Sequence, residues 1–525
     1  MGRSCFLTLF LSGILCSNAV AEQHFFNAAG GSEQGSLRRF TQSIQQVLST
    51  AQEHDLDVWH ATSAFVDVYS PPDAPILPEN LISLAHTTTL VPARAPIQRR
   101  AQSNWDLGSL DNSTFHDFYH PLYEVEAFLH QLADSHPEIT RLVKLGHSAE
   151  GREMLGLTIS TGEYEEEEDK RKKNKDKNKP KPRTPIAHEG QKLGFVVLGA
   201  QHAREWIATA TSLYVAHALV SNISESNSLQ KLLKHYDFYF IPVPNPDGYE
   251  YTWETDRYWY KNRQILGPHT KCVGLDMNRC VHISYTPHTF LAIKSVSLSQ
   301  KLGTFLRFLQ FSLFFLNLAQ GHKWKSFSEG LLPNSNRTDS APEDPCSHWY
   351  PGSRPFESYE VNNIANWVTT LGNVVGFIDL RSYGQMLSSP FSYSCKKMPL
   401  DAEDQVEAAL GATAALKAVH GTHFKVGSLC SMLYPAPGNV LDWMYAKKGI
   451  KYSYATHLRD TGTYGFSLPE KWIKPTGQET SKLVNYLARF IARQAKREFF
   501  AGQGYTSVLL TFQSTSRRVL DELLG

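Results

Sequence analysis

The chain has 525 residues, of which 42% are hydrophobic and 12% aromatic, a composition typical of a globular protein with one large domain and additional segments. Its 52 Lys and Arg residues nearly balance its 51 Asp and Glu residues. This balance offers no electrostatic basis for binding nucleic acid or an anionic membrane, so we expect neither partner.

Residues 1–21 have the features of a cleaved secretory signal peptide. Arg3 gives a basic start, an apolar run from Cys5 to Cys16 follows, and the segment closes with the small residues Ala19 to Ala21. The alternative is a buried N-terminal helix. A signal peptide predicts a secreted protein, in a compartment where cysteines tend to pair.

Residues 22–105 read as a small, separate region. The pattern predicts a helix over Leu37–Ala51 and a strand over Ala64–Tyr69, after an alternating run at Leu56–Trp59. The region ends near the dibasic pair Arg99-Arg100, which is either a processing site or two solvated surface charges.

From His116 onward, apolar strand patterns alternate with helical ones, which predicts a layered α/β sheet. Ligands in such sheets bind at the carboxyl ends of the strands. The expected strands are Ile139–Leu145, Phe195–Leu198, Phe238–Val243, Val374–Leu380 and Ile450–Tyr454, and the expected helices are Leu122–His136, Trp206–Val220 and Asp404–Ala418.

Residues 163–183 are highly charged and contain almost no apolar side chain. Such a segment cannot bury enough surface to fold, so it predicts a disordered surface loop. Its lysines leave nucleic-acid or phosphoinositide binding as an alternative, which the adjoining acidic block disfavours.

A candidate metal-ligand pair, His202 and Glu205, directly follows the strand Phe195–Leu198. An imidazole nitrogen and a carboxylate oxygen at this spacing can converge on one ion, and both suit zinc. His-x-x-Glu occurs by chance in many proteins, so the pair gains weight only from other motifs.

Those motifs come in a characteristic order further along the chain. They are Pro244–Tyr249, Arg257–Arg263, Gly274–Arg279, Asp379–Gln385 and Leu458–Phe466. Across roughly residues 115–500, the residue identities and spacing of these motifs resemble those of the M14 zinc metallocarboxypeptidases. The resemblance is strongest to the fungal inactive metallocarboxypeptidase-like proteins linked to cell-wall biogenesis.

The resemblance implies an α/β/α sandwich on a mixed eight-stranded sheet, preceded by a shortened α+β propeptide-like region at 22–105 and followed by a C-terminal tail at 501–525. It also implies two disulfides, Cys272 with Cys346 and Cys395 with Cys430. Cys280 is then the odd cysteine. Three tripeptides are acceptors for N-linked glycans, at Asn112, Asn222 and Asn336.

Carried over residue by residue, the resemblance implies that the groups for hydrolysis are missing. A third zinc ligand, a His, is required, but its position holds Arg381, which has no lone pair to offer a metal. The position of the family's catalytic Glu holds His457, whose use as a replacement ligand is an alternative. Tyr260 stands where the family has an arginine that polarises the substrate carbonyl.

The residues that hold substrate in the family are largely retained. Asn278 and Arg279 match the pair that binds a C-terminal carboxylate, for which a bidentate arginine is suited. The other matching positions are Arg204, Ser382, Tyr383 and the mobile tyrosine, Tyr434. Each could also be an ordinary polar or packed residue.

Residues 280–320 interrupt the resemblance with an apolar stretch that has no family counterpart. We interpret it as translated intron sequence or another gene-model fault. The alternatives are a real insertion loop and, least favoured, a membrane anchor. The uninterrupted apolar part is shorter than the roughly 20 residues that a membrane-spanning helix needs.

The sequence therefore predicts a monomeric pseudoenzyme, secreted or vacuolar, with weakened zinc binding. By resemblance its partners are peptide C-termini or cell-wall components, in cell-wall organisation. The alternative function is an active zinc exopeptidase that releases C-terminal amino acids. A third hypothesis is that both Arg381 and the 280–320 stretch are sequence errors.

Overall fold

The computed structural model describes residues 34–74, 77–92, 105–162, 192–268, 270–279 and 344–524, with side chains up to residue 498. The predicted signal peptide, the charged loop at 163–183, the 280–320 stretch, Arg99-Arg100, Cys280 and Asn336 lie outside these residues. Among the described residues, no helix combines the length and apolarity that crossing a membrane would require.

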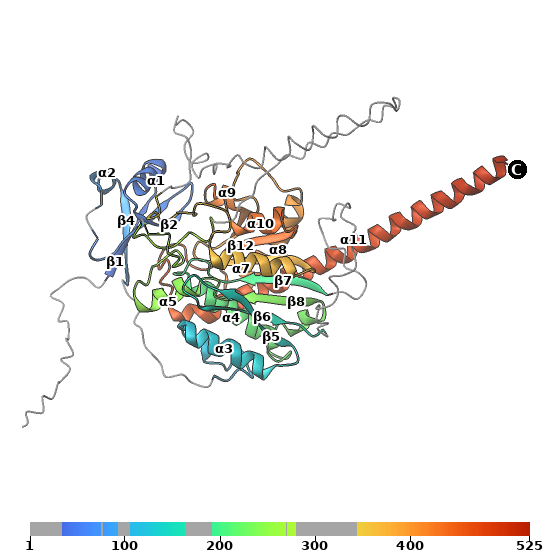
Figure 1. The fold of residues 1–525 in the computed structure, drawn as a ribbon, viewed down its shortest axis with the longest axis horizontal. Helices are drawn as coiled ribbons and strands as arrows, with labels where there is room; N and C mark the ends of the chain where they lie inside the picture. Colours follow the sequence, from blue (N-terminus) through green and yellow to red (C-terminus); the bar gives the residue numbers. More distant parts are fainter. Residues whose placement is uncertain are drawn as a thin grey trace, which may run out of the picture.

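A mixed eight-stranded sheet forms the centre of the molecule, as predicted (Figure 1). Its order is β11-β10-β12-β9-β7-β8-β6-β5, with β12, β9, β7 and β8 parallel to one another and antiparallel pairs on both sides. The strands are β5 (Thr140–His147), β6 (Glu153–Ile159), β7 (Leu193–Leu198), β8 (Tyr236–Ile241), β9 (Val374–Arg381), β10 (Met386–Ser389), β11 (Lys425–Ser428) and β12 (Tyr452–His457).

Helices cover both faces of this sheet, which gives three layers. Residues of α3, α4, α8 and α11 share one buried cluster with side chains such as Phe195 and Val197, whereas α7 and α10 pack with the alternate side chains Val196 and Leu198. The helices of the large domain are α3 (Leu122–Ser135), α4 (Trp206–Val220), α5 (Pro246–Glu254), α7 (Tyr359–Thr370), α8 (Ala402–His420), α9 (Leu429–Met432), α10 (Val440–Ala446) and α11 (Ile473–Leu524). The last of these continues past residue 501, where we placed the start of a tail.

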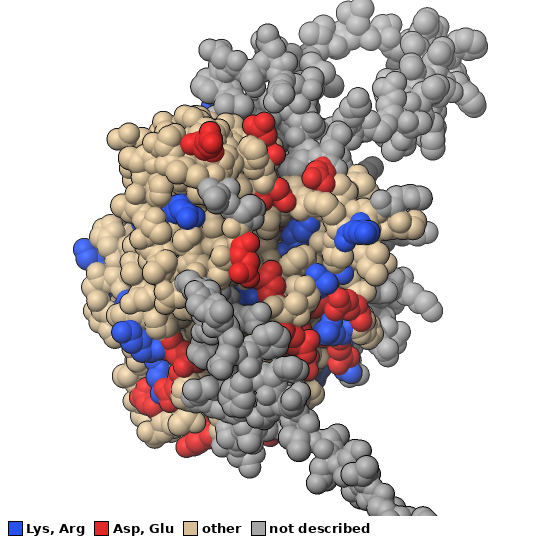
Figure 2. Space-filling model, turned by 90° about the vertical axis from the view of Figure 1, so that its left-hand side faces the viewer, with Lys and Arg blue, Asp and Glu red and all other residues tan. Residues whose placement is uncertain are grey.

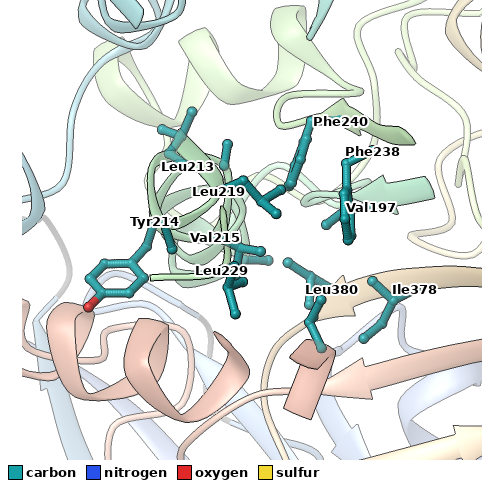
Figure 3. Close-up of a cluster of buried hydrophobic side chains, with 14 of the residues drawn as sticks. Val197, Leu213, Tyr214, Val215, Leu219, Leu229, Phe238, Phe240, Ile378 and Leu380 are labelled. Carbon is teal, nitrogen blue, oxygen red and sulfur yellow. The ribbon is translucent and has the colours of Figure 1, made fainter. Parts of the chain in front are cut away.

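Helix α4 lies in the middle of the larger cluster (Figure 3). Every one of its 15 residues is buried, because it packs on the sheet on one side and on α11 on the other. A helix that is apolar all round is expected in such a position. Its predicted bounds are confirmed.

Residues 34–92 form a second, four-stranded antiparallel sheet of order β2-β3-β1-β4. The prediction of one helix over Leu37–Ala51 is wrong at its start: residues through Phe40 form a strand between β3 and β4, and the helix begins at Ile44. Pairing on both sides outweighed local helix propensity here. The elements are β1 (Gln34–Phe40), α1 (Ile44–Glu53), β2 (Asp57–Ala61), β3 (Val66–Ser70), α2 (Glu79–Ile82) and β4 (His86–Pro92).

This N-terminal sheet packs on the large domain through an aromatic cluster. Trp59 and Tyr69 of the N-terminal sheet lie against Tyr258, Tyr383 and Phe466, with ring centroids 4.6–5.3 Å apart in the paired contacts. On the described part of this side of the molecule, Figure 2 shows acidic and basic side chains interspersed among uncharged ones, as the balanced composition predicts.

An ion pair between a buried carboxylate and a partly exposed arginine adds to this contact. Asp67 on β3 is completely buried and accepts two hydrogen bonds of 2.6 Å from Arg39. The Tyr383 hydroxyl of the large domain donates a third to the same carboxylate, at 2.8 Å. Arg39 also donates to the carbonyl of Thr461. One carboxylate thus joins the two sheets.

Both predicted disulfides, Cys272–Cys346 and Cys395–Cys430, are present. Asn112 and Asn222 are exposed on the surface, as a glycan acceptor has to be.

His217 of helix α4 pairs with a second buried histidine, His116. His116 Nε2 lies 3.0 Å from His217 Nδ1, and His217 Nε2 lies 3.1 Å from the carbonyl oxygen of Leu107. Burial lowers the pKa of His217 from 6.5 to about 4, and it also lowers the pKa of His116 well below its usual value. Between pH 6.5 and 4 the unfolded chain therefore binds more protons than the folded one, and stability falls as the pH falls.

We predict that His217 alone lowers the free energy of unfolding by about 2 kcal/mol between pH 7 and pH 5. Urea unfolding at the two pH values measures this difference. It should shrink in His217→Gln and persist in a control, His130→Gln, because His130 is exposed on α3. An unchanged difference in His217→Gln would contradict the assignment.

We also predict that Asp67→Asn destabilises the protein by about 2 kcal/mol, because it removes the buried charge that accepts hydrogen bonds from both Arg39 and Tyr383. Urea unfolding measures the loss. The matched control is Glu153→Gln, which removes the exposed pair with Lys144 and should cost less than about 1 kcal/mol. Equal effects of the two substitutions would argue against the joining role of Asp67.

Candidate functional site

The residues of the candidate site lie at the carboxyl ends of three neighbouring parallel strands, at one edge of the sheet. His202 and Glu205 lie in the turn between β7 and α4, Arg381 ends β9, and His457 ends β12. Arg381 and His457 are register partners on adjacent strands. The carboxyl ends of parallel strands meet at one edge, so residues far apart in the chain come together, as the sequence predicted.

The central contact of the site joins Arg381 to Glu205. The Arg381 Nε donates to Glu205 Oε2 at 3.0 Å and its Nη2 donates to Oε1 at 2.9 Å, a side-on bidentate pair. The backbone N–H of Ser382 donates to Oε2 at 3.1 Å. Arg381 and Glu205 are both at most 5% exposed. Both oxygens of this carboxylate are therefore engaged.

His202 has a partner on each side of its ring. Its Nε2 lies 2.8 Å from Asp276 Oδ1, and its Nδ1 lies 3.0 Å from Glu205 Oε1 and in hydrogen-bond contact with Arg381 Nη2. The Nε2–H donates to Asp276, an assignment made from the partners, and Nδ1 lies between the Arg381 guanidinium and the Glu205 carboxylate. The Tyr260 ring stacks on this imidazole at 3.7 Å.

This donor set does not fit a zinc ion. A zinc site takes at least three protein ligands with free lone pairs, and the described residues contain no group of three His, Cys, Asp or Glu side chains placed to hold a metal. The lone pairs of His202 Nδ1 and Glu205 both face N–H groups of Arg381. A guanidinium has no lone pair to contribute in return.

Charge and burial set the protonation states of the site. Burial alone would raise the pKa of Glu205, but the Arg381 charge and the contacts with His202 lower it to about 2. Burial raises the pKa of Asp379, which accepts from Arg381 and Gln201, to about 6. Burial and then the Arg381 charge lower the pKa of His457 to about 3, so this imidazole is neutral at pH 7.

A cavity of about 100 Å³ lies beside this cluster. All nine residues predicted for metal and substrate binding line it: His202, Arg204, Glu205, Tyr260, Asn278, Arg279, Ser382, Tyr383 and Tyr434. Its other walls include His457 and, from the N-terminal sheet and α1, residues such as Trp59, His60 and Leu48. The structure thus brings every predicted site residue to one place.

Several of these residues already have protein partners. Arg204 donates to Asp57 on β2 at 2.8 Å and 2.9 Å, and Tyr383 donates to Asp67. Arg279 donates to the Tyr434 hydroxyl at 3.1 Å. The Asn278 side chain accepts from the N–H of Val440 at 3.2 Å.

Other polar atoms of the lining residues lack such partners. Within the described part of the chain, His457 Nδ1, Ser382 Oγ and Arg204 Nε are buried and have no hydrogen-bond partner.

Sequence reasoning missed four acidic residues that organise the site: Asp57, Asp67, Asp276 and Asp379. The last two belong to motifs already recognised, Gly274–Arg279 and Asp379–Gln385. Their position next to His202 and Arg381 could have been inferred from the sequence. Histidines in metal-ligand motifs commonly donate their second ring N–H to a carboxylate. Asp57 and Asp67 carry no such signal, because only the docking of the two sheets brings them near.

Comparison with known proteins separates fold from activity. The family described as zinc carboxypeptidase matches residues 125–483. An inactive metallocarboxypeptidase, ECM14, of Paracoccidioides brasiliensis is 30% identical over 86% of this chain and 72% of its own length. Carboxypeptidase A4 of Mus musculus is 29% identical over 90% of this chain and 95% of its own length.

Among solved structures, thrombin-activatable fibrinolysis inhibitor superposes with a TM-score of 0.63 at 24% identity, covering 88% of this chain and 99% of its own. At this identity the likeness shows the fold alone. The sequence relatives include proteins named as inactive and a protein named as a carboxypeptidase at nearly the same identity, so overall similarity does not decide activity. The matched residues span more than half of the chain, and this protein belongs to the zinc carboxypeptidase family.

Proposed function

We propose that this protein is an inactive member of its family, which has kept the fold and a binding cavity and does not hydrolyse peptides. The observation that carries the proposal is the contact of Arg381 with both His202 and Glu205, because it directs N–H groups at the atoms that would hold zinc. In this proposal Arg381 occupies the third-ligand position, and zinc binding is weakened accordingly.

Two further replacements support the same conclusion. At the position proposed for the catalytic Glu, His457 is a neutral, partly exposed imidazole, so it provides no carboxylate to take a proton from water. At the position proposed for the carbonyl-polarising arginine, Tyr260 directs its hydroxyl to Asp276 at 3.3 Å. Loss of one such donor typically costs about 3–4 kcal/mol at the transition state.

The remaining function is binding. Asn278, Arg279 and Tyr434 line the cavity next to the apolar residues Leu429 and Leu433, an arrangement that suits a peptide C-terminus. From the resemblance of its motifs to fungal proteins linked to cell-wall biogenesis, we propose an exported or vacuolar protein that acts in cell-wall organisation through such binding. The predicted signal peptide and the exposed acceptors Asn112 and Asn222 support export.

The test is hydrolysis of peptides with free and with amidated C-termini, by the full chain in excess zinc. We expect no release of C-terminal residues. We also expect none from His457→Glu, because the new carboxylate would still face a site whose ligand atoms are engaged by Arg381. Release that requires a free C-terminus and stops with a chelator would establish the active exopeptidase instead.

A further inference from the structure

Three buried carboxylates converge on the strand ends of the candidate site. Glu205, Asp276 and Asp379 are all at most 2% exposed, although they come from three separate segments of the chain. Carboxylates in a buried cluster repel one another and lose their hydration, so such a cluster needs a cation. The stability of this edge of the sheet is therefore a question separate from peptide hydrolysis.

Arg381 is the cation at the centre of this cluster. Its Nε and Nη2 pair with Glu205, its Nη2 also donates to His202 Nδ1, and its Nη1 lies 3.4 Å from Asp379 Oδ2. These contacts link the end of β9 to the turn after β7. A planar guanidinium can make such divergent contacts at once, which a point-like ammonium cannot.

The charge balance of the three carboxylates shows why this cluster needs the Arg381 cation. The three carboxylates face two guanidinium groups, because Arg279 lies 3.6 Å from Asp276 through its Nε. Without the Arg381 charge, the fully ionised cluster would carry two uncompensated negative charges. A divalent metal ion would offset both of these charges, and the single charge of the Arg381 guanidinium offsets one of them.

We infer that the Arg381 guanidinium is a built-in structural cation that replaces the metal ion at this site, so that the folded protein is independent of zinc. The inference deepens the proposed function, on which it rests for the identity of the third-ligand position. It concerns stability and metal uptake, whereas the proposed function concerns hydrolysis. A protein could be inactive and still depend on zinc.

The experiment measures bound zinc by elemental analysis after gel filtration, and the melting temperature with zinc or with a chelator. For the unmodified full chain we expect no stoichiometric zinc and the same melting temperature in both conditions. One tightly held zinc per chain, with a lower melting temperature in chelator, would overturn the inference even if the protein hydrolysed nothing.

Arg381→His tests the replacement directly. Without zinc it should melt at least about 5 °C lower than the unmodified chain, since a buried carboxylate loses its partner. It should also bind one zinc per chain, and zinc at about one hundred times its Kd should raise the melting temperature by about 4 °C. A folded Arg381→His protein that takes up no zinc would contradict the inference.

Two further variants separate this role from a general effect of removing a buried arginine. Arg257→His replaces a buried arginine that donates to the carbonyl oxygens of Arg204 and Phe466, so it should lower the melting temperature without any response to zinc. Arg381→Met removes the charge without adding a ligand and should behave in the same way. A zinc-dependent rise in either variant would place the metal elsewhere and contradict the inference.

Discussion

The contact between Arg381 and Glu205 determines what the carboxypeptidase fold of this protein can do. A guanidinium and a carboxylate in side-on bidentate geometry, both buried, leave neither carboxylate oxygen available to another cation. The same guanidinium directs an N–H at His202. The Arg381 charge lowers the pKa of Glu205 to about 2 against the effect of burial, and it adds to the effect of burial in lowering the pKa of His457 to about 3. The electrostatics of the cavity thus follow from one side chain.

The N-terminal sheet is part of this arrangement. It contributes Asp57 to Arg204 and Asp67 to Tyr383, and its side chains form one side of the cavity. These contacts use polar groups of residues that the resemblance assigned to substrate binding. A partner that reaches the cavity therefore meets a surface built from both sheets, with Trp59 and His60 among its walls. This makes the N-terminal region relevant to what the protein binds.

Much of the fold was predictable because the chain's local patterns agree with its tertiary structure. Helix α4 has its predicted bounds because an apolar run of its length can be buried on all sides. The strand over Val374–Leu380 extends by one residue, and the one at Ile450–Tyr454 begins and ends later than expected. Segment Leu37–Phe40 was assigned wrongly, because its pairing with β3 and β4 comes from residues 26 or more positions away. The local sequence of this segment does not indicate that pairing.

For the candidate site, the sequence by itself determined the family and the residues of the cavity, including the arginine that we propose at the third-ligand position. This was possible because the motifs occur in a characteristic order and a guanidinium cannot coordinate a metal. Only the tertiary structure decided where that guanidinium points, and that Asp67 meets Tyr383 across 316 positions. Such contacts depend on the strand order and on how two sheets dock, which are properties of the folded chain as a whole.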